Sequence, residues 1–178
     1  ELIEGVSLRY VSSLKELGNP DMIILPGTKN TIGDLKWMRQ NGLEAEILKK
    51  ASNGTVVCGV CGGFQMLGTN ISDPYGVEEG GDTPGLGLLK VETSFIEKKR
   101  TIQMEGRLGK VEGLFSALSD MNIVGYEIHS GVTEFAPEHA LTSIKPIHEE
   151  GDVMLEGSQN VDEKYSVYGS YVHGIFDA

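Results

Sequence analysis

The sequence predicts one α/β domain, spanning residues 1–178, with an open, mainly parallel β-sheet flanked by helices. In the first half, short runs rich in β-branched residues alternate with stretches of helical periodicity, as in βαβ units. One of these runs, residues 55–60, is apolar almost throughout, which is typical of a strand covered on both faces. A length of 178 residues fits one such domain and is short for two.

Apolar spacing, with Gly, Asn and Pro as stop signals, predicts six elements in the first half. In chain order they are a strand at 6–11, a short helix at 13–17, a buried strand at 22–25, helices at 31–40 and 43–51, and the central strand at 55–60.

The second half has a different pattern of short alternating runs, which we interpret mostly as strands. These runs lie at 88–95, 101–108, 125–135, 141–147 and 165–173. Between the halves, residues 72–87 are rich in Gly, Pro and acidic side chains, and we expect a mobile surface loop there.

Charge and cysteine usage exclude several classes of partner. The chain carries 15 Lys and Arg against 26 Asp and Glu, a net charge of −11, which repels nucleic acid and anionic membranes. Its apolar runs are much shorter than the roughly 20 residues of a membrane span. Two cysteines three positions apart make no secreted disulfide framework, so we expect a cytoplasmic protein. Because it begins at Glu1 without Met, we expect a piece of a longer chain.

The strongest chemical signal is residues 59–68, which follow the central strand and open a helix-compatible segment. Gly59-x-Cys61-x-Gly63 has the spacing of a nucleophile elbow, in which small flanking residues allow a strained turn. At a helix N-terminus, the pKa of the Cys61 thiol should be lowered, and free backbone N–H groups should face an oxyanion. Cys61 is therefore the candidate nucleophile.

Two other interpretations of this segment stay open. Cys61 could be merely a small residue in a Gly-rich turn. The Cys58-x-x-Cys61 spacing could mark a redox dithiol or half of a zinc site. No second cysteine pair exists to complete a metal tetrahedron, so we expect no metal. Cys58 ends an apolar run, so we expect it to lie in the core.

A cysteine nucleophile needs a base, and four histidines are available. His173 ends a β-rich run and is followed by glycine, so it should project from a strand edge. His139 and His148 lie among charged and turn residues, which favours solvent exposure. His129 lies in a polar segment bounded by glycines, which could meet a ligand or cap a strand.

Residues 26–31 form a second Gly-containing loop after a strand. They lack the spacing of a nucleotide phosphate loop, so nucleotide binding is rejected there. The loop should lie at the carboxyl edge of the sheet beside Cys61, where α/β proteins bind ligands.

Four motifs in order, at residues 25–31, 59–68, 125–131 and 171–177, resemble class I glutamine amidotransferases of flavodoxin-like fold. The resemblance runs from about residue 6 to residue 177 and is closest to the cobyric-acid-synthase type. It implies that Cys61 attacks the side-chain amide of glutamine, forms a glutamyl thioester and releases ammonia. His173 would shuttle the protons.

The same resemblance assigns roles to further residues. In that family, backbone N–H groups of the Pro-Gly loop and of the residue after the nucleophile form the oxyanion hole, here Gly27 and Gly62. Gln65 would help to hold the bound glutamine. His129 and Ser130 lie in the stretch that resembles the lining of the glutamine pocket.

The resemblance also implies a larger protein. This domain would be the C-terminal glutaminase, with an N-terminal ATP-dependent ligase domain that holds ATP and Mg and amidates the corrinoid cobyrinic acid a,c-diamide to cobyric acid. No cofactor is expected in the glutaminase domain itself. The family's domain usually begins with one more strand than is visible before Val6, so the sheet could lack its first strand.

The chain departs from the general class I pattern at Ile175, where most members carry the Glu that orients the histidine. Loss of this Glu is shared by the cobyric-acid type. Asp177, Glu127, a backbone carbonyl or a group of the ligase domain remain candidates for that role.

Three alternatives remain. One is the glutaminase of a related amidotransferase, acting with lipid II or in cobyrinic acid a,c-diamide synthesis. Another is a degenerate domain that docks a partner without chemistry. The third is a redox protein that uses its two cysteines.

Overall fold

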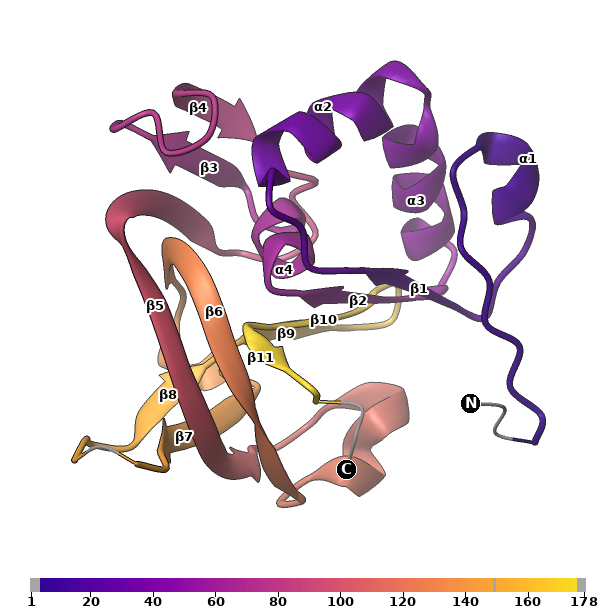
Figure 1. The fold of residues 1–178 in the computed structure, drawn as a ribbon. Helices are drawn as coiled ribbons and strands as arrows, with labels where there is room; N and C mark the ends of the chain where they lie inside the picture. Colours follow the sequence, from indigo (N-terminus) through magenta and orange to yellow (C-terminus); the bar gives the residue numbers. More distant parts are fainter. Residues whose placement is uncertain (1–3, 149, 176–178) are drawn as a thin grey trace.

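A four-stranded sheet, in the order β1-β2-β10-β9, lies at the centre of the computed structural model (Figure 1). The structure describes residues 4–148 and 150–175. The strands are β1 (Met22–Leu25), β2 (Val56–Val60), β10 (Ser166–Ser170) and β9 (Ser158–Val161). β1 and β10 both run parallel to β2, and β9 is antiparallel to β10. The predicted parallel centre of the sheet is therefore confirmed.

Helices cover one face of this sheet (Figure 1). They are α2 (Thr31–Gln40), α3 (Leu43–Ser52) and α4 (Gly62–Leu67), with the short α1 (Leu14–Leu17) to one side. The apolar stripe of α2, with Ile32 and Leu35, is fully buried, and so is Phe64 of α4. The predicted helices at 31–40 and 43–51 agree with α2 and α3 to within one residue.

A second sheet of seven strands covers the other face. Its path is β11-β6-β5-β3-β4, with β7 paired to β5 and β8 paired to β7. Its strands are β3 (Asn70–Asp73), β4 (Gly81–Pro84), β5 (Glu92–Leu108), β6 (Asn122–Glu134), β7 (Thr142–Pro146), β8 (Met154–Glu156) and β11 (Val172–His173), and the 3-10 helices are η1 (Gly113–Leu118) and η2 (Pro137–His139). Figure 1 shows β5 and β6 as a long, bent pair beside the first sheet.

The first sheet divides the core into two clusters. Along β2, Val57 belongs to the cluster on the helix side, whereas Val56 and Cys58 belong to the cluster shared with the second sheet. Both faces of β2 are therefore covered, as the unbroken apolar run predicted. Cys58 lies in the core, as expected.

The predicted strand at 6–11 is wrong. These residues form no strand, and the side chains of Val6, Leu8 and Tyr10 are 57%, 73% and 94% exposed. A strand needs a neighbour for its backbone hydrogen bonds, and none of the described strands pairs with this segment. β1 is consequently an edge of the four-stranded sheet as described.

The expected mobile loop at 72–87 is also wrong, since it contains the end of β3 and all of β4. Its tip wraps around the buried carboxylate of Asp73, which accepts the N–H groups of Val77, Glu78 and Gly80. Burial alone would raise the pKa of Asp73, but these hydrogen bonds together outweigh it and lower the pKa. Among the described residues, no helix is long and apolar enough to cross a membrane.

Candidate active site

Cys61 occupies the sharp turn between β2 and α4. Its backbone has φ 53° and ψ −111°, an unusual conformation for a residue with a side chain. The turn packs against β1 only because residue 63 is glycine. A Cβ at this position would stand 2.0 Å from the backbone oxygen of Leu25. The elbow predicted from the Gly-x-Cys-x-Gly spacing is therefore present.

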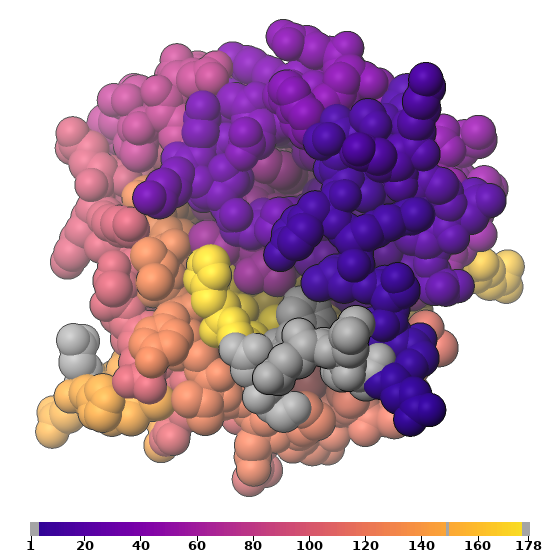
Figure 2. Space-filling view, turned by 45° about the vertical axis from the view of Figure 1, so that its right-hand side comes forward, coloured from indigo at the N-terminus to yellow at the C-terminus, as the bar shows by residue number. Residues whose placement is uncertain are grey.

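His173 lies beside this elbow, although it comes from the far end of the chain. It ends β11, which pairs with β6, and Gly27 lies close to both His173 and Cys61. A Cβ at Gly27 would stand 3.0 Å from His173 Cε1 and 3.5 Å from Cys61 Cβ. Figure 2 shows the yellow C-terminal segment surfacing between the purple first half and the orange β6 region. Residues of three predicted motifs thus lie together, and Ile128 of the fourth motif accepts a hydrogen bond from Cys61 Sγ.

The Cys61 thiol is at rest against β6. Its Sγ donates a hydrogen bond of 3.4 Å to the carbonyl oxygen of Ile128. Burial raises the pKa of this thiol, against the opposing effects of the Gly62 N–H and the Lys99 charge. The expected low pKa is therefore wrong: the helix that follows has only six residues, and the side chain is almost fully buried.

The His173 ring is uncharged, as a proton acceptor must be. Burial lowers its pKa, and the nearby His129 lowers it further, so the ring is neutral at pH 7. Its Nε2 is buried and has no hydrogen-bond partner among residues 4–148 and 150–175. The carboxylate of Glu127, one candidate for orienting this ring, lies instead 2.7 Å from Arg100 Nε. Asp177, another candidate, falls outside the described residues.

The Pro-Gly loop touches the elbow directly. A Cβ at Gly62 would stand 3.2 Å from the backbone nitrogen of Thr28 and 2.7 Å from its methyl group. The backbone of residues 27–28 therefore lies against the first turn of α4, where helix N–H groups have no intrahelical partner. The pairing of the Gly27 and Gly62 N–H groups around an oxyanion stays a prediction.

Gln65 is buried in α4 and both ends of its amide are engaged. Its Oε1 accepts a 3.0 Å hydrogen bond from Thr31, and its Nε2 donates a 3.1 Å hydrogen bond to the Tyr171 hydroxyl. Tyr171 in turn shares a hydrogen bond with Thr133 of β6. Gln65 therefore links α2, α4 and the segment that leads to His173.

His129 faces inward from β6 and is held in one orientation. Its Nδ1 lies 2.7 Å from the carbonyl oxygen of Gly131, so that nitrogen carries the proton. The ring stacks on Tyr171, with centroids 3.6 Å apart. Ser130, the next residue of β6, is half-buried.

The whole chain matches the model of the CobB/CobQ-like glutamine amidotransferase domain, over residues 1–178. This chain belongs to that family. It is 50% identical to a cobyric acid synthase of Ruminiclostridium cellulolyticum and 46% identical to one of Lachnoclostridium phytofermentans, with 99% of the chain covered in each case. It spans 34% and 35% of the length of these two relatives. A crystal structure of a glutamine amidotransferase aligns over 97% of this chain and 80% of its own, with a TM-score of 0.60 and 20% identity, which supports the fold.

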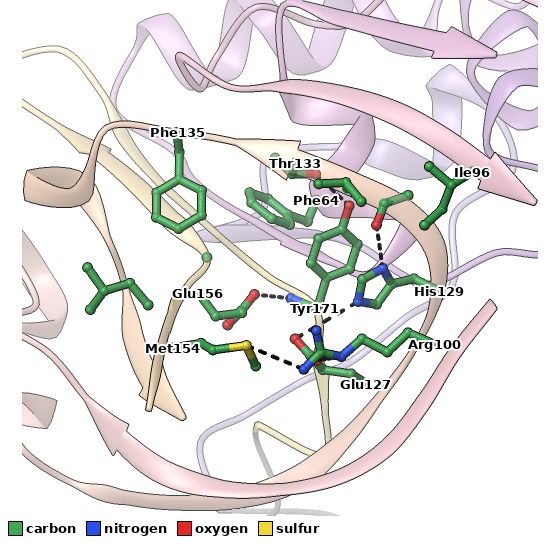
Figure 3. Close-up of a pocket in the computed structure, with 14 residues that line it drawn as sticks. Phe64, Ile96, Arg100, Glu127, His129, Thr133, Phe135, Met154, Glu156 and Tyr171 are labelled. Atoms are coloured by element: carbon green, nitrogen blue, oxygen red, sulfur yellow. Dashed lines mark hydrogen bonds and ion pairs between the residues drawn. The ribbon is translucent and has the colours of Figure 1, made fainter. Parts of the chain in front are cut away.

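A cavity of about 210 Å³ in this amidotransferase domain is lined mainly by residues of β5, β6 and β8 (Figure 3). Its polar lining includes Arg100, Glu127, His129, Thr133 and Glu156, and the Tyr171 ring closes one side. The described residues that line it include neither Cys61 nor His173. The cavity is thus separate from the elbow, although His129 and Tyr171 border both regions.

The two cysteines of the amidotransferase domain lie in different core clusters and are both free thiols. Burial raises the pKa of Cys58 to about 12, which makes it unreactive at neutral pH. Among the described residues, no group of three or more His, Cys, Asp or Glu side chains is arranged to hold a metal ion.

Sequence reasoning missed several residues that shape this amidotransferase site. Glu78 caps α2 by accepting the N–H groups of Thr31 and Ile32, although it comes from the presumed loop. Tyr171 lies in a predicted strand and in the 171–177 motif, yet neither predicts that it joins Gln65 to β6. These contacts cross long stretches of sequence, and the only local signal was the acidic composition of residues 72–87.

Proposed function

We propose that this domain hydrolyses the side-chain amide of glutamine, with Cys61 as nucleophile and His173 as proton carrier. The observation that carries the proposal is the meeting of Cys61, His173 and Gly27 around one point. Membership of the amidotransferase family supports it.

The first half-reaction begins with the thiol on the Ile128 carbonyl. The thiol turns toward His173, which takes its proton because its lowered pKa keeps the ring neutral at pH 7. Cys61 Sγ then attacks the amide carbon, and the N–H groups of Gly27 and Gly62 stabilise the negative charge on the amide oxygen. His173 gives the proton to the leaving nitrogen, the C–N bond breaks, and ammonia departs from a glutamyl thioester.

In the second half-reaction, His173 accepts a proton from water, whose oxygen attacks the thioester carbon. The C–S bond breaks, glutamate leaves, and His173 returns the proton to Cys61. Gln65, His129 and Ser130 hold the glutamine during both steps; the fixed ring of His129 and the bonded amide of Gln65 give that contact surface a defined shape.

The ammonia would serve an amidation in a longer protein. We propose an N-terminal ligase part that uses ATP and Mg²⁺ to amidate cobyrinic acid a,c-diamide to cobyric acid in the cytoplasm. The names and lengths of the two relatives support this role over the lipid II and cobyrinic acid a,c-diamide alternatives. The candidates for orienting His173 then include Asp177 and a group of the ligase part.

The direct test is mass spectrometry after incubation with 6-diazo-5-oxo-norleucine, a glutamine-like electrophile. We expect one adduct, at Cys61, that Cys61→Ala abolishes and His173→Ala slows. Cys58→Ala is the matched control and should react like the unaltered chain, because Cys58 is buried with a pKa of about 12. Absence of an adduct would favour a partner-docking module, and an adduct at Cys58 would contradict the assignment of the nucleophile.

A further inference from the structure

One peptide group connects the candidate nucleophile with a buried carboxylate. The carbonyl oxygen of Ser170 accepts a 2.8 Å hydrogen bond from the backbone N–H of Cys61. On the other side of the same peptide, the N–H of Tyr171 donates to Glu156 Oε1 (Figure 3). The Ser170–Tyr171 peptide is therefore held between Cys61 and Glu156, at the point where the chain passes from β10 to β11.

The other oxygen of Glu156 strengthens the same connection. Oε2 accepts hydrogen bonds of 2.8 Å from the hydroxyls of Ser170 and Thr142. The Ser170 hydroxyl also accepts a 3.0 Å hydrogen bond from the N–H of Val172, the residue before His173. Glu156 thus holds the backbone N–H of Tyr171 directly and that of Val172 through the Ser170 hydroxyl, in the two residues that precede His173.

The backbone around Glu156 brings its carboxylate close to β10. Glu156 ends β8, and the following Gly157 has φ 71°. A Cβ at Gly157 would stand 2.5 Å from the carbonyl oxygen of Gly169, so only glycine allows β8 to approach β10 this closely. The Glu156 side chain is buried, and within the part of the chain that the structure describes its bonded donors are two hydroxyls and one peptide N–H, with no cation among them.

Burying the carboxyl group of Glu156 costs free energy of folding, and a well-packed apolar residue at this position would stabilise the fold at least as much. The contacts of Glu156 therefore indicate a role other than stability. From these contacts we infer that Glu156 is a positioning residue that sets the distance between Cys61 and His173 by holding the Ser170–Tyr171 peptide. This inference rests on the proposed function of that pair.

The inference predicts an effect on chemistry rather than on binding. Glu156 touches neither Cys61 nor His173 directly, and a displacement of about 1 Å in a reacting pair can lower a rate about 100-fold. For Glu156→Ala we therefore expect a rate constant of Cys61 alkylation at saturating 6-diazo-5-oxo-norleucine that is about 30- to 100-fold lower. The reagent concentration that gives half the maximal rate should stay within about twofold, since the glutamine-contacting residues are unchanged.

Conservative variants separate positioning from simple loss of stability. Glu156→Gln keeps an oxygen for the Tyr171 N–H, and its amide can donate to both hydroxyls, so we expect a rate within about threefold of the unaltered chain. Ser170→Ala removes the link to Val172 and should lower the rate about 5- to 10-fold, which provides a test if Glu156→Ala fails to fold. Thr142→Val is the matched control: it removes a buried partner of Glu156 without touching the held peptide, and it should react within about twofold of the unaltered chain.

Amide hydrogen exchange at Cys61 and Tyr171 provides a readout that is independent of activity. We expect faster exchange at both amides in Glu156→Ala than in Thr142→Val. Equal exchange in the two variants, or faster exchange without any loss of alkylation rate, would overturn the inference while leaving the proposed function intact. An unaltered chain that folds but shows no alkylation at Cys61 would instead overturn the proposed function, and the inference with it.

Discussion

The region from β1 to α4 and the region from β5 to β11 differ in architecture, the first with a parallel strand pair and covering helices and the second with mainly antiparallel pairs. In the first region, β1 pairs with β2 and the helices cover the same sheet, so each element is close to its neighbours along the chain. In the second, β5 pairs with β6 over most of its length, and Val167 of β10 returns to pair with Val57. The first region supplies Cys61 and the second supplies His173. The comparison shows that the sharp turn at Cys61 is formed within the first region, although the Cys61 N–H is hydrogen-bonded to Ser170, whereas His173 is placed by the pairing of β11 with β6.

The largest effect should come from breaking the turn in the first region. In Gly63→Ala, the new methyl group would stand 2.0 Å from the backbone oxygen of Leu25, and no flexible side chain can yield there. We expect a loss of more than about 3 kcal/mol in the free energy of unfolding, measured by urea titration.

Gly54→Ala is the control in the same region. A Cβ at Gly54 meets nothing within 4 Å, although its φ is +90°, so its cost should be about 1 kcal/mol. Equal losses for the two variants would mean that the close approach at Gly63 is not what shapes the turn.

In the second region, the raised pKa of Glu156 should make the free energy of unfolding depend on pH. Burial raises its pKa from 4.5 to about 7. The unfolded chain ionises first as the pH rises, so this group destabilises the fold progressively between pH 4.5 and 7, by about 3 kcal/mol in all. Glu156→Gln should remove that dependence.

The measurement is urea unfolding of the unaltered chain and of Glu156→Gln at pH 5 and pH 8. The difference between the two proteins cancels other titrating groups, including His173, whose lowered pKa acts in the opposite direction as the pH falls. A difference that does not change between the two pH values would contradict a raised pKa for Glu156.

A smaller effect, of opposite sign, is expected at the nucleophile. Cys61 has φ 53° and ψ −111°, and glycine adopts such a conformation without strain. Cys61→Gly should therefore unfold at higher urea than Cys61→Ala, with a gain of about 1 kcal/mol, although both abolish the reaction.

Asp120, the other residue with a side chain and a positive φ in the described chain, sharpens this comparison. Its φ is 63°, a value that Asp tolerates in turns, so Asp120→Gly should change stability by less than about 0.5 kcal/mol. If substitution by glycine stabilised the protein as much at Asp120 as at Cys61, the backbone strain at the elbow would be no greater than in an ordinary turn.

The smallest effect concerns the loop that joins the two regions. Glu78 accepts two N–H groups at the start of α2, so Glu78→Gln should cost about 0.5–1 kcal/mol. Glu79→Gln, which affects only an exposed ion pair with Lys36, should cost less than about 0.5 kcal/mol. Similar thermal melting of the two variants would argue against a capping role for Glu78.

The difference between these two regions also explains which elements could be predicted from the sequence. β1, β2, α2 and α3 agree with their predicted ranges to within one residue because their periodicity and stop signals are local. In the second half, two predicted runs merge into β5, and β8 and β9 were missed, because pairing with distant strands decides their extent. The segment at 6–11 has the composition of a strand but no partner among the described residues.

The candidate site divides in a similar way. Cys61, Gly27 and His173 were each predicted from a short motif, and the structure brings them together. Glu156 had no such signal, since its hydrogen bonds to Ser170 and Tyr171 exist only after β8 and β10 have come together. The direction of the Cys61 pKa was predicted wrongly because burial, which outweighs the effect of a short helix, is a property of the folded molecule.

The hydrogen bond from Cys61 to the Ile128 carbonyl has a consequence for the survival of the protein between turnovers. Peroxides oxidise thiolates far faster than thiols, and they need access to the sulfur. A protonated sulfur that is almost fully buried and pointed at a backbone oxygen meets neither condition. In the resting elbow the Cys61 sulfur is therefore expected to react slowly with peroxides, and under the proposed mechanism it becomes reactive only when His173 takes its proton.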